Sequence, residues 1–167
     1  MFIDFSTDNI LIQKDQIELW SNYYAWAFRQ YGRTHKVFFD ILDRMTRCLS
    51  QYQSLYNEPA LVRAWVMYSE FLKKPIDAYR WMKEKKIGNK SYIFYSEYAK
   101  IVEKLTRDFK KVDKIYRHGL KEMPDQRYMK RLQTKYDSFG DRMQGRIDEI
   151  MPFEKSNSNN KESAKRK

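Results

Sequence analysis

Hydrophobic residues recur every three or four positions through most of the chain, which is the period of an amphipathic helix. Within this pattern, a pair of aromatic residues at positions i and i+3, neighbours on one helix face, occurs three times. The pairs are Trp20 with Tyr23, Trp65 with Tyr68, and Tyr95 with Tyr98. A second apolar segment of the same period follows each pair. Because a single helical hairpin cannot bury its own apolar face, this recurrence predicts an array of stacked hairpins.

Turn-forming residues divide the first part of the pattern into two hairpins. Residues 20–31 and 38–49 carry two apolar stripes separated by a glycine-containing break, and they form the first hairpin. Pro59 and Pro75 suit the first turns of two further helices, because proline lacks the N–H that a helix start leaves unpaired. We expect them to begin the two helices of the second hairpin, which ends at Ile87-Gly88.

A third hairpin and a solitary final helix follow. Ser91 and Asp108 are the predicted N-caps of the third pair of helices, and Pro124 ends the second of them. The last helix carries the most regular apolar stripe of the chain. Its members are Leu132, Tyr136, Phe139, Met143, Ile147 and Ile150. We expect this long C-terminal helix to cap the array, since a terminal repeat needs one face covered and the other polar. The alternative is that its stripe forms the seam of a coiled-coil dimer.

Composition agrees with a single all-α domain. A chain of 167 residues has the length of one domain, and 13 Tyr and 10 Phe beside only 5 Gly and 4 Pro favour helices over strands. We expect the domain to span residues 15–151, with a flexible segment at residues 1–14 and a disordered basic tail at residues 152–167. No apolar stretch reaches the roughly 20 residues of a membrane helix. A single cysteine and an N-terminus without a basic or apolar signal region predict a protein of the cytosol or nucleus, and no membrane helix is expected.

The charge is strongly basic and unevenly placed. The formal net charge is +11. Residues 1–28 hold one Lys against four acidic residues, whereas residues 103–135 hold 11 Lys or Arg against 5 Asp or Glu. Such a field attracts an acidic partner or nucleic acid. The alternative interpretation is that these charges only solvate the outer faces of helices.

The sequence offers few groups for catalysis. His35, His118 and Cys48 cannot supply the four ligands of a structural zinc site, so no metal is expected. The five glycines are too scattered to form a phosphate-binding loop, so no nucleotide cofactor is expected either. Cys48 lies beside an apolar stripe and suits a small core residue. We therefore predict that the protein is not an enzyme and uses no cofactor.

Several short motifs, in a fixed order, carry a resemblance to a known family. They are Trp20-x-x-Tyr23-x-x-Trp26, the segment FFDILDR at residues 38–44, the Ile87-Gly88 linker, and Phe94-Tyr95-x-x-Tyr98-Ala99 at the start of the segment 91–139. This set resembles the tetratricopeptide-like homology domain at the N-terminus of the Mad and Bub spindle-assembly checkpoint proteins. The resemblance covers about residues 16–147. Each motif alone is shared with half-a-tetratricopeptide repeats, whereas their order and spacing are typical of the checkpoint family.

The resemblance implies a non-enzymatic checkpoint adaptor domain. Family members dock a short helical motif of the outer-kinetochore scaffold protein on the convex face of the array, and other checkpoint proteins are further possible partners. The implied localisation is the nucleus and the kinetochore, with the cytoplasm before mitotic recruitment. Carried over by position, the docking surface includes Tyr68, Asp77 and Tyr116. This chain has Asp77 where relatives have an amide and Tyr116 where they have an aliphatic residue. For Tyr68 and Tyr116, the alternative is a place in the core between helices.

Two departures from the family narrow the expected function to docking. The Lys-Glu-Asn degron of Mad-type members does not occur in this sequence, and 167 residues leave no room for a kinase domain. We expect either a reduced protein or one piece of a longer one. The alternative function is that of a half-a-tetratricopeptide RNA-processing scaffold subunit, which would use the same aromatic pairs and the net positive charge. Of the two kinds of partner, a protein peptide and a nucleic acid, the nucleic acid is the less favoured.

Overall fold

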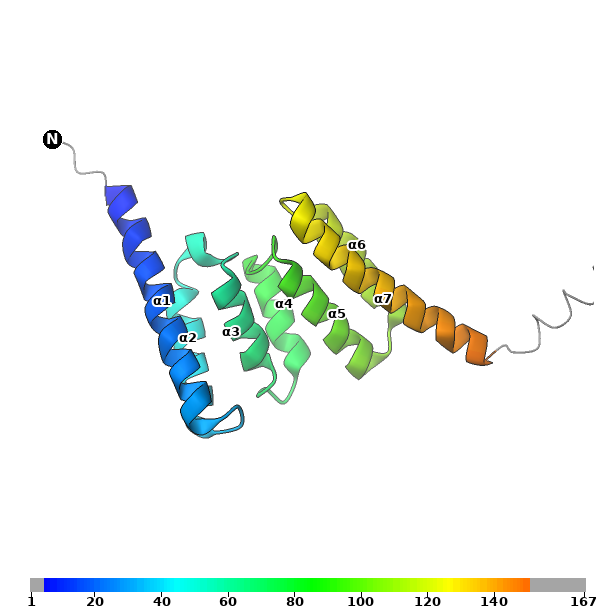
Figure 1. Cartoon of the computed structure of the whole chain (residues 1–167), viewed down its shortest axis with the longest axis horizontal. Helices are drawn as coiled ribbons and strands as arrows, with labels where there is room; N and C mark the ends of the chain where they lie inside the picture. The colour runs from blue at the N-terminus through cyan, green and yellow to red at the C-terminus, as the bar shows by residue number, and fades with distance from the viewer. Residues whose placement is uncertain (1–4, 151–167) are drawn as a thin grey trace, which may run out of the picture.

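The computed structural model describes the backbone of residues 5–150 and the side chains of residues 15–146, and these residues form helices and no strand (Figure 1). The elements in chain order are α1 (Phe5–Tyr31), α2 (Lys36–Leu49), the short 3₁₀ helix η1 (Gln53–Leu55), α3 (Pro59–Ser69), α4 (Pro75–Lys85), α5 (Tyr92–Thr106), α6 (Phe109–Glu122) and α7 (Gln126–Ile150). The predicted all-α array of three helical hairpins followed by a long C-terminal helix is confirmed.

The helices stand side by side in chain order and form two layers (Figure 1). The odd-numbered helices make one layer, in which α1 packs on α3, α3 on α5, and α5 on α7. Each even-numbered helix packs on its hairpin partner and on the next odd-numbered helix. This is how each hairpin buries the apolar face that its neighbour leaves open.

Residues at the helix starts have the roles that the sequence predicted, with two differences. Pro59 and Pro75 occupy the first turns of α3 and α4, and the Asp108 carboxylate accepts a hydrogen bond from the Lys111 N–H at 3.0 Å. Ser91 is the N-cap residue of α5, but its side chain makes no capping hydrogen bond. His35, which was not predicted as a cap, is the N-cap of α2, and its Nδ1 accepts a hydrogen bond from the Val37 N–H at 3.2 Å.

The first helix begins earlier than predicted. Residues 1–14 were expected to be a flexible segment, whereas α1 begins at Phe5. The physical reason is that residues 5–31 contain neither glycine nor proline, so nothing in this segment ends a helix once it has formed. Residues 1–4 and the predicted disordered tail at residues 152–167 lie outside the residues that the structure describes.

Two of the three aromatic pairs join neighbouring hairpins, and the first does not. Trp65 is 9% exposed, its ring centre lies 4.5 Å from that of Trp81, and its Nε1–H donates to the Ser50 hydroxyl at 3.0 Å. In the third pair, Tyr98 is buried and its ring stacks on Tyr79 of α4 with the ring centres 5.4 Å apart. Tyr23, in contrast, is 46% exposed, so the recurring pair that predicted stacked hairpins does not lie between two hairpins at its first occurrence. Tyr23 lies on the outer side of α1, where no preceding hairpin covers it within the described residues.

Two glycines allow elements to approach closely. Gly88 follows α4 with φ +75°, and its N–H donates to the Tyr56 carbonyl at 2.7 Å. A Cβ atom at Gly119 on α6 would lie 2.5 Å from the Tyr95 Cγ and 2.8 Å from the Leu132 Cδ2. Helices α5, α6 and α7 therefore meet at a point where only a hydrogen atom fits.

The final helix caps the array through its apolar stripe. Leu132 and Phe139 are buried, and Tyr136 and Met143 pack against the core on the side that faces α5 and α6. The side chains of Ile147 and Ile150 lie outside the described residues. Because Leu132, Tyr136, Phe139 and Met143 are covered by the array, the described part of the stripe is not available as the seam of a coiled-coil dimer.

Candidate functional site

The three residues predicted to form a docking surface do not lie together. Tyr68 is in the last turn of α3 and Asp77 is in the first turn of α4, so both lie at the end of the second hairpin where the loop 70–74 joins these helices. Tyr116 is in the middle of α6, in the third hairpin. Only Tyr68 and Asp77 can therefore belong to one local surface.

Tyr68 is half-buried, and neighbouring groups hold it in place. Its ring stacks on Phe39 of α2, with ring centres 5.5 Å apart and planes 12° apart. Its hydroxyl donates to the Asp43 carboxylate at 3.1 Å, which Arg47 also approaches. Burial, together with this hydrogen bond to a carboxylate, raises the pKa of the Tyr68 hydroxyl. The ring is oriented and partly exposed, which suits an aromatic residue in a binding surface.

Asp77 is exposed, and its position already has a local explanation. It lies in the first turn of α4, where a carboxylate interacts favourably with the positive end of the helix dipole. One oxygen also forms an ion pair with Arg80, 3.1 Å from its Nη1. A partner that approached Asp77 would meet this pair, because neither charge is buried.

Tyr116 is a core residue. Its side chain is 1% exposed, and its ring stacks on Tyr136 of α7 with the ring centres 5.3 Å apart. Burial raises the pKa of the Tyr116 hydroxyl to about 12. The prediction that Tyr116 contributes to the docking surface is therefore wrong. Helix α6 packs on both α5 and α7, and Tyr116 lies on the side that contacts α7. Its ring is therefore covered by α7 and does not reach solvent.

The residue before Tyr116 lines a groove that the sequence analysis missed. This groove, which we name the α4–α6 groove, has a volume of about 290 Å³. Its floor is apolar, and four of its lining side chains are lysine or histidine. The lining residues are Phe94, Tyr95 and Tyr98 of α5, Ile115 of α6, Lys83 of α4, and Lys111, Lys114 and His118 of α6.

The lysines of the α4–α6 groove are unpaired cations. Within the described residues, Lys83, Lys111 and Lys114 have no ion pair with a carboxylate. The Tyr98 ring on the floor stacks on Tyr79 at 5.4 Å, and burial raises the pKa of the Tyr98 hydroxyl. An apolar floor with a basic rim is suited to an apolar side chain that carries acidic residues beside it. In the sequence, this basic rim is indicated by Lys111 and Lys114, which are one helical turn apart and therefore share one face of the helix.

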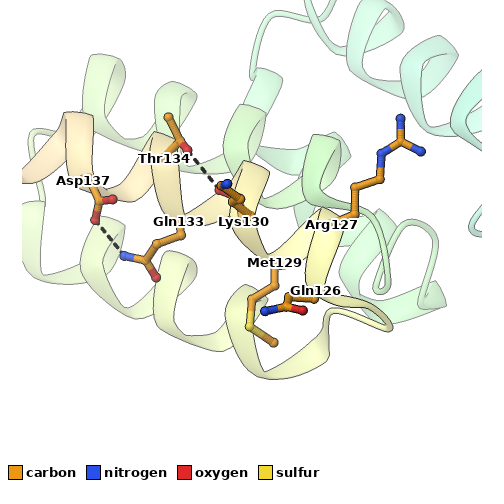
Figure 2. Close-up of a pocket in the computed structure, with 7 residues that line it drawn as sticks. All are labelled: Gln126, Arg127, Met129, Lys130, Gln133, Thr134 and Asp137. Atoms are coloured by element: carbon orange, nitrogen blue, oxygen red, sulfur yellow. Dashed lines mark hydrogen bonds between the residues drawn. The ribbon is translucent and has the colours of Figure 1, made fainter.

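A second hollow lies along the first half of α7 and is shown in Figure 2. Its volume is about 850 Å³, and all of its lining residues come from this one helix. Most of them are polar: the Gln133 Nε2 donates to Asp137 at 2.7 Å, and the Thr134 hydroxyl donates to the Lys130 carbonyl at 3.0 Å. A surface from a single helix, in which Met129 is the apolar member, gives little of the enclosure that a small-molecule site has.

Metal and membrane sites were sought within the same residues. Across residues 15–146, no three His, Cys, Asp or Glu side chains come together as metal ligands would. No helix in the described part of the chain is long and apolar enough to cross a membrane.

Comparison with known proteins gives consistent matches. The profile of the family described as Mad3/BUB1 homology region 1 matches residues 6–120. The mitotic spindle checkpoint component mad3 of Schizosaccharomyces pombe is 27% identical over 128 residues, which is 75% of this chain and 40% of that protein. The chain thus spans less than half the length of this relative.

Two solved structures share the fold. The conserved N-terminal domain of the mitotic checkpoint component BUB1 superposes with a TM-score of 0.69 at 18% identity, over 78% of this chain and 68% of that one. A chain in the crystal structure of the mitotic checkpoint complex superposes with a TM-score of 0.68 at 23% identity, over 89% of this chain and 72% of that one.

Proposed function

Because the chain belongs to the Mad3/BUB1 homology region 1 family, we propose that it is an adaptor of the spindle-assembly checkpoint that docks a short helical motif of the outer-kinetochore scaffold. The family region is a non-catalytic protein-interaction domain, in agreement with the prediction that the protein is not an enzyme. Its place of action would be the nucleus and the kinetochore. Other checkpoint proteins are proposed as further partners, since a relative of this fold occurs in a mitotic checkpoint complex.

The observation that carries this proposal is the α4–α6 groove. A helical peptide binds by placing apolar anchors at i, i+3 or i+4 into a hydrophobic groove. Tyr95 and Tyr98 give the α4–α6 groove an aromatic floor, and three unpaired lysines surround it. In this arrangement the peptide anchor covers the floor, and acidic residues of the peptide meet Lys83, Lys111 and Lys114.

Tyr68 and Asp77 have a separate part in the proposal. Arg80 and Lys83 follow Asp77 at successive spacings of three residues on α4, so the helix surface is continuous from Asp77 to the groove. A peptide longer than the groove would extend along α4 towards Asp77 and Tyr68. Tyr116, being buried, would act on binding only through the position of Ile115.

The test is binding of a fluorescently labelled scaffold peptide, followed by fluorescence polarisation. Reversing one charge of the rim with Lys111→Glu should weaken binding about tenfold or more, and Tyr68→Ala should weaken it less. The matched control is Lys110→Glu, because Lys110 is the exposed neighbour of Lys111 on α6 but does not line the groove. No binding by the unmodified chain, or equal effects of Lys110→Glu and Lys111→Glu, would contradict the proposed site.

One feature distinguishes this proposal from the RNA-scaffold alternative. Binding of single-stranded RNA requires exposed aromatic rings on a basic surface, on which the bases stack. Here the rings beside the unpaired lysines form the floor of a groove and are at most 6% exposed, so they can line a pocket for a side chain but leave no free ring face for a base. The exposed rings lie instead on α1 near Asp15 and Glu18. An RNA arm of the same experiment, titrated with salt, should therefore give only weak binding that falls steeply as salt rises.

A further inference from the structure

The outer side of α1 carries a stripe of exposed hydrophobic residues. Leu19, Tyr23 and Trp26 are 70%, 46% and 41% exposed, and their spacing of four and three residues places them on one face of the helix. We name these three residues the α1 stripe. The rings contact each other: Tyr23 stacks on Trp26 with ring centres 5.6 Å apart, and Tyr31 meets Trp26 edge to face at 5.7 Å.

A stripe of this kind is unexpected at the end of a helical array. Terminal repeats need a polar outer face to remain soluble. At the other end of this molecule, α7 buries Leu132 and Phe139 and exposes polar residues. Helix α1 packs on α2 and α3, and within the described residues no element covers its outer side. Clustered exposed hydrophobic residues indicate an interaction surface.

Charged residues lie beside the α1 stripe, and the order of their signs along the helix restricts which surface can pack on it. Asp15 and Glu18 precede the centre of the stripe, and Arg29 follows it. Glu18 and Arg29 are eleven residues apart, about three helical turns, so they lie on the same flank of the stripe. All three are exposed, and none has an ion pair within the described residues. One flank is therefore negative towards the N-terminus and positive towards the C-terminus.

We propose that the α1 stripe is covered by the α1 stripe of a second copy of this chain, in an antiparallel two-fold pair. When two antiparallel helices meet face to face, the same flank of each helix comes together. Glu18 of one copy would then lie opposite Arg29 of the other, and the two-fold axis would repeat this pair. A parallel pair would instead bring opposite flanks together, so Glu18 and Arg29 would not meet across the interface and this charge pairing would be lost.

The apolar contacts follow the same symmetry. With the two-fold axis beside Tyr23, Leu19 of each copy covers Trp26 of the other, and the two Tyr23 rings meet at the centre. A fully buried aromatic residue covers roughly 150–250 Å², and these are already half covered, so each copy contributes a few hundred Å². Interfaces of this size are smaller than those of stable dimers, so the proposed dimer is weak and forms only at high protein concentration. This inference does not depend on the α4–α6 groove, which lies on other helices.

The oligomeric state of the full chain tests the proposal, measured by sedimentation velocity over a range of protein concentrations. We expect a concentration-dependent dimer, and Tyr23→Glu should raise its dissociation constant at least tenfold. The matched control is Leu105→Glu, because Leu105 is also an exposed hydrophobic residue but lies on α5. Circular dichroism would show that each variant keeps its helices.

A charge exchange tests the antiparallel order without altering the apolar residues. Glu18→Arg alone and Arg29→Glu alone should each weaken the dimer, whereas the double variant should restore it to within about threefold of the original affinity. A chain that stays monomeric at every concentration would overturn the proposal and leave the α1 stripe to a helix of a different protein. A dimer that is indifferent to Tyr23→Glu, or a double variant no better than the single ones, would overturn it as well.

Discussion

At the scale of single residues, Trp65 illustrates how one side chain joins two hairpins. Its ring packs on Trp81 of its own hairpin and meets Tyr68 edge to face, and its N–H reaches Ser50 beyond the end of α2. The side chain therefore combines apolar burial with a satisfied polar group, which is what a buried indole needs.

Replacing this side chain should be costly. We expect Trp65→Ala to lower the free energy of unfolding by about 3–5 kcal/mol, because a cavity would remain between the first and second hairpins. Urea denaturation followed by circular dichroism measures the change. Trp26→Ala is the control, since Trp26 is exposed on α1 and its loss should change stability by far less. Equal losses in both variants would show that Trp65 does not have the core role described above.

The environment of such residues could be predicted only in part. The spacing of Tyr23, Tyr68 and Tyr98 from their partners correctly predicted helices, yet these tyrosines are exposed, half-buried and buried, respectively. Spacing defines which residues share a face, but the covering of that face depends on which helix packs there. The same limit explains Tyr116: the sequence placed it on an apolar stripe, and only the position of α7 decides that it is inaccessible.

At the scale of helices, the residues that begin a helix, proline in the first turn and aspartate at the N-cap, were the reliable part of the prediction. Pro59, Pro75 and Asp108 begin helices as expected, because their effects are local to one turn. The start of α1 was missed because residues 1–14 show no clear apolar period. The α4–α6 groove was missed for a different reason: its walls come from three helices, and their separation depends on side-chain sizes at the contacts between them.

Two glycines in consecutive helices should respond to the same substitution with opposite signs. Gly119→Ala on α6 places a methyl group against Tyr95 and Leu132 and should destabilise the fold by about 1–3 kcal/mol. Gly140→Ala on α7 meets no atom within 4 Å and should stabilise it by up to about 1 kcal/mol through helix propensity. Thermal and urea denaturation of the two variants would reveal the signs. Stabilisation by Gly119→Ala would mean that α5, α6 and α7 do not approach each other as closely as described.

At the scale of the whole molecule, buried tyrosines occur in successive hairpins. Tyr79 of α4 and Tyr116 of α6 are almost completely covered, and burial raises the pKa of each hydroxyl to about 12. In the unfolded chain the tyrosine pKa is about 10. The folded state therefore holds these protons more tightly than the unfolded state does.

This difference predicts a loss of stability in alkali. The contribution is complete below about pH 10 and disappears as pH rises towards about 12, since the unfolded chain ionises first. Each unit of difference in pKa corresponds to about 1.4 kcal/mol. Urea denaturation at several alkaline pH values should show the decline, and Tyr116→Phe should make it shallower. A pH dependence that is the same with and without Tyr116 would show that this hydroxyl is not buried.

The order of packing between helices has a consequence for how the molecule comes apart. The main contacts of every helix are with helices one or two places away in the chain, and α5 contacts four of them. Contacts that are close in sequence form quickly, so folding should be fast for a chain of this length. Opening should begin at the two ends of the array, α1 and α7, each of which packs on two helices from one side only, and reach α5 last. Force applied to the two ends would accordingly peel the hairpins away one at a time instead of shearing the whole array at once.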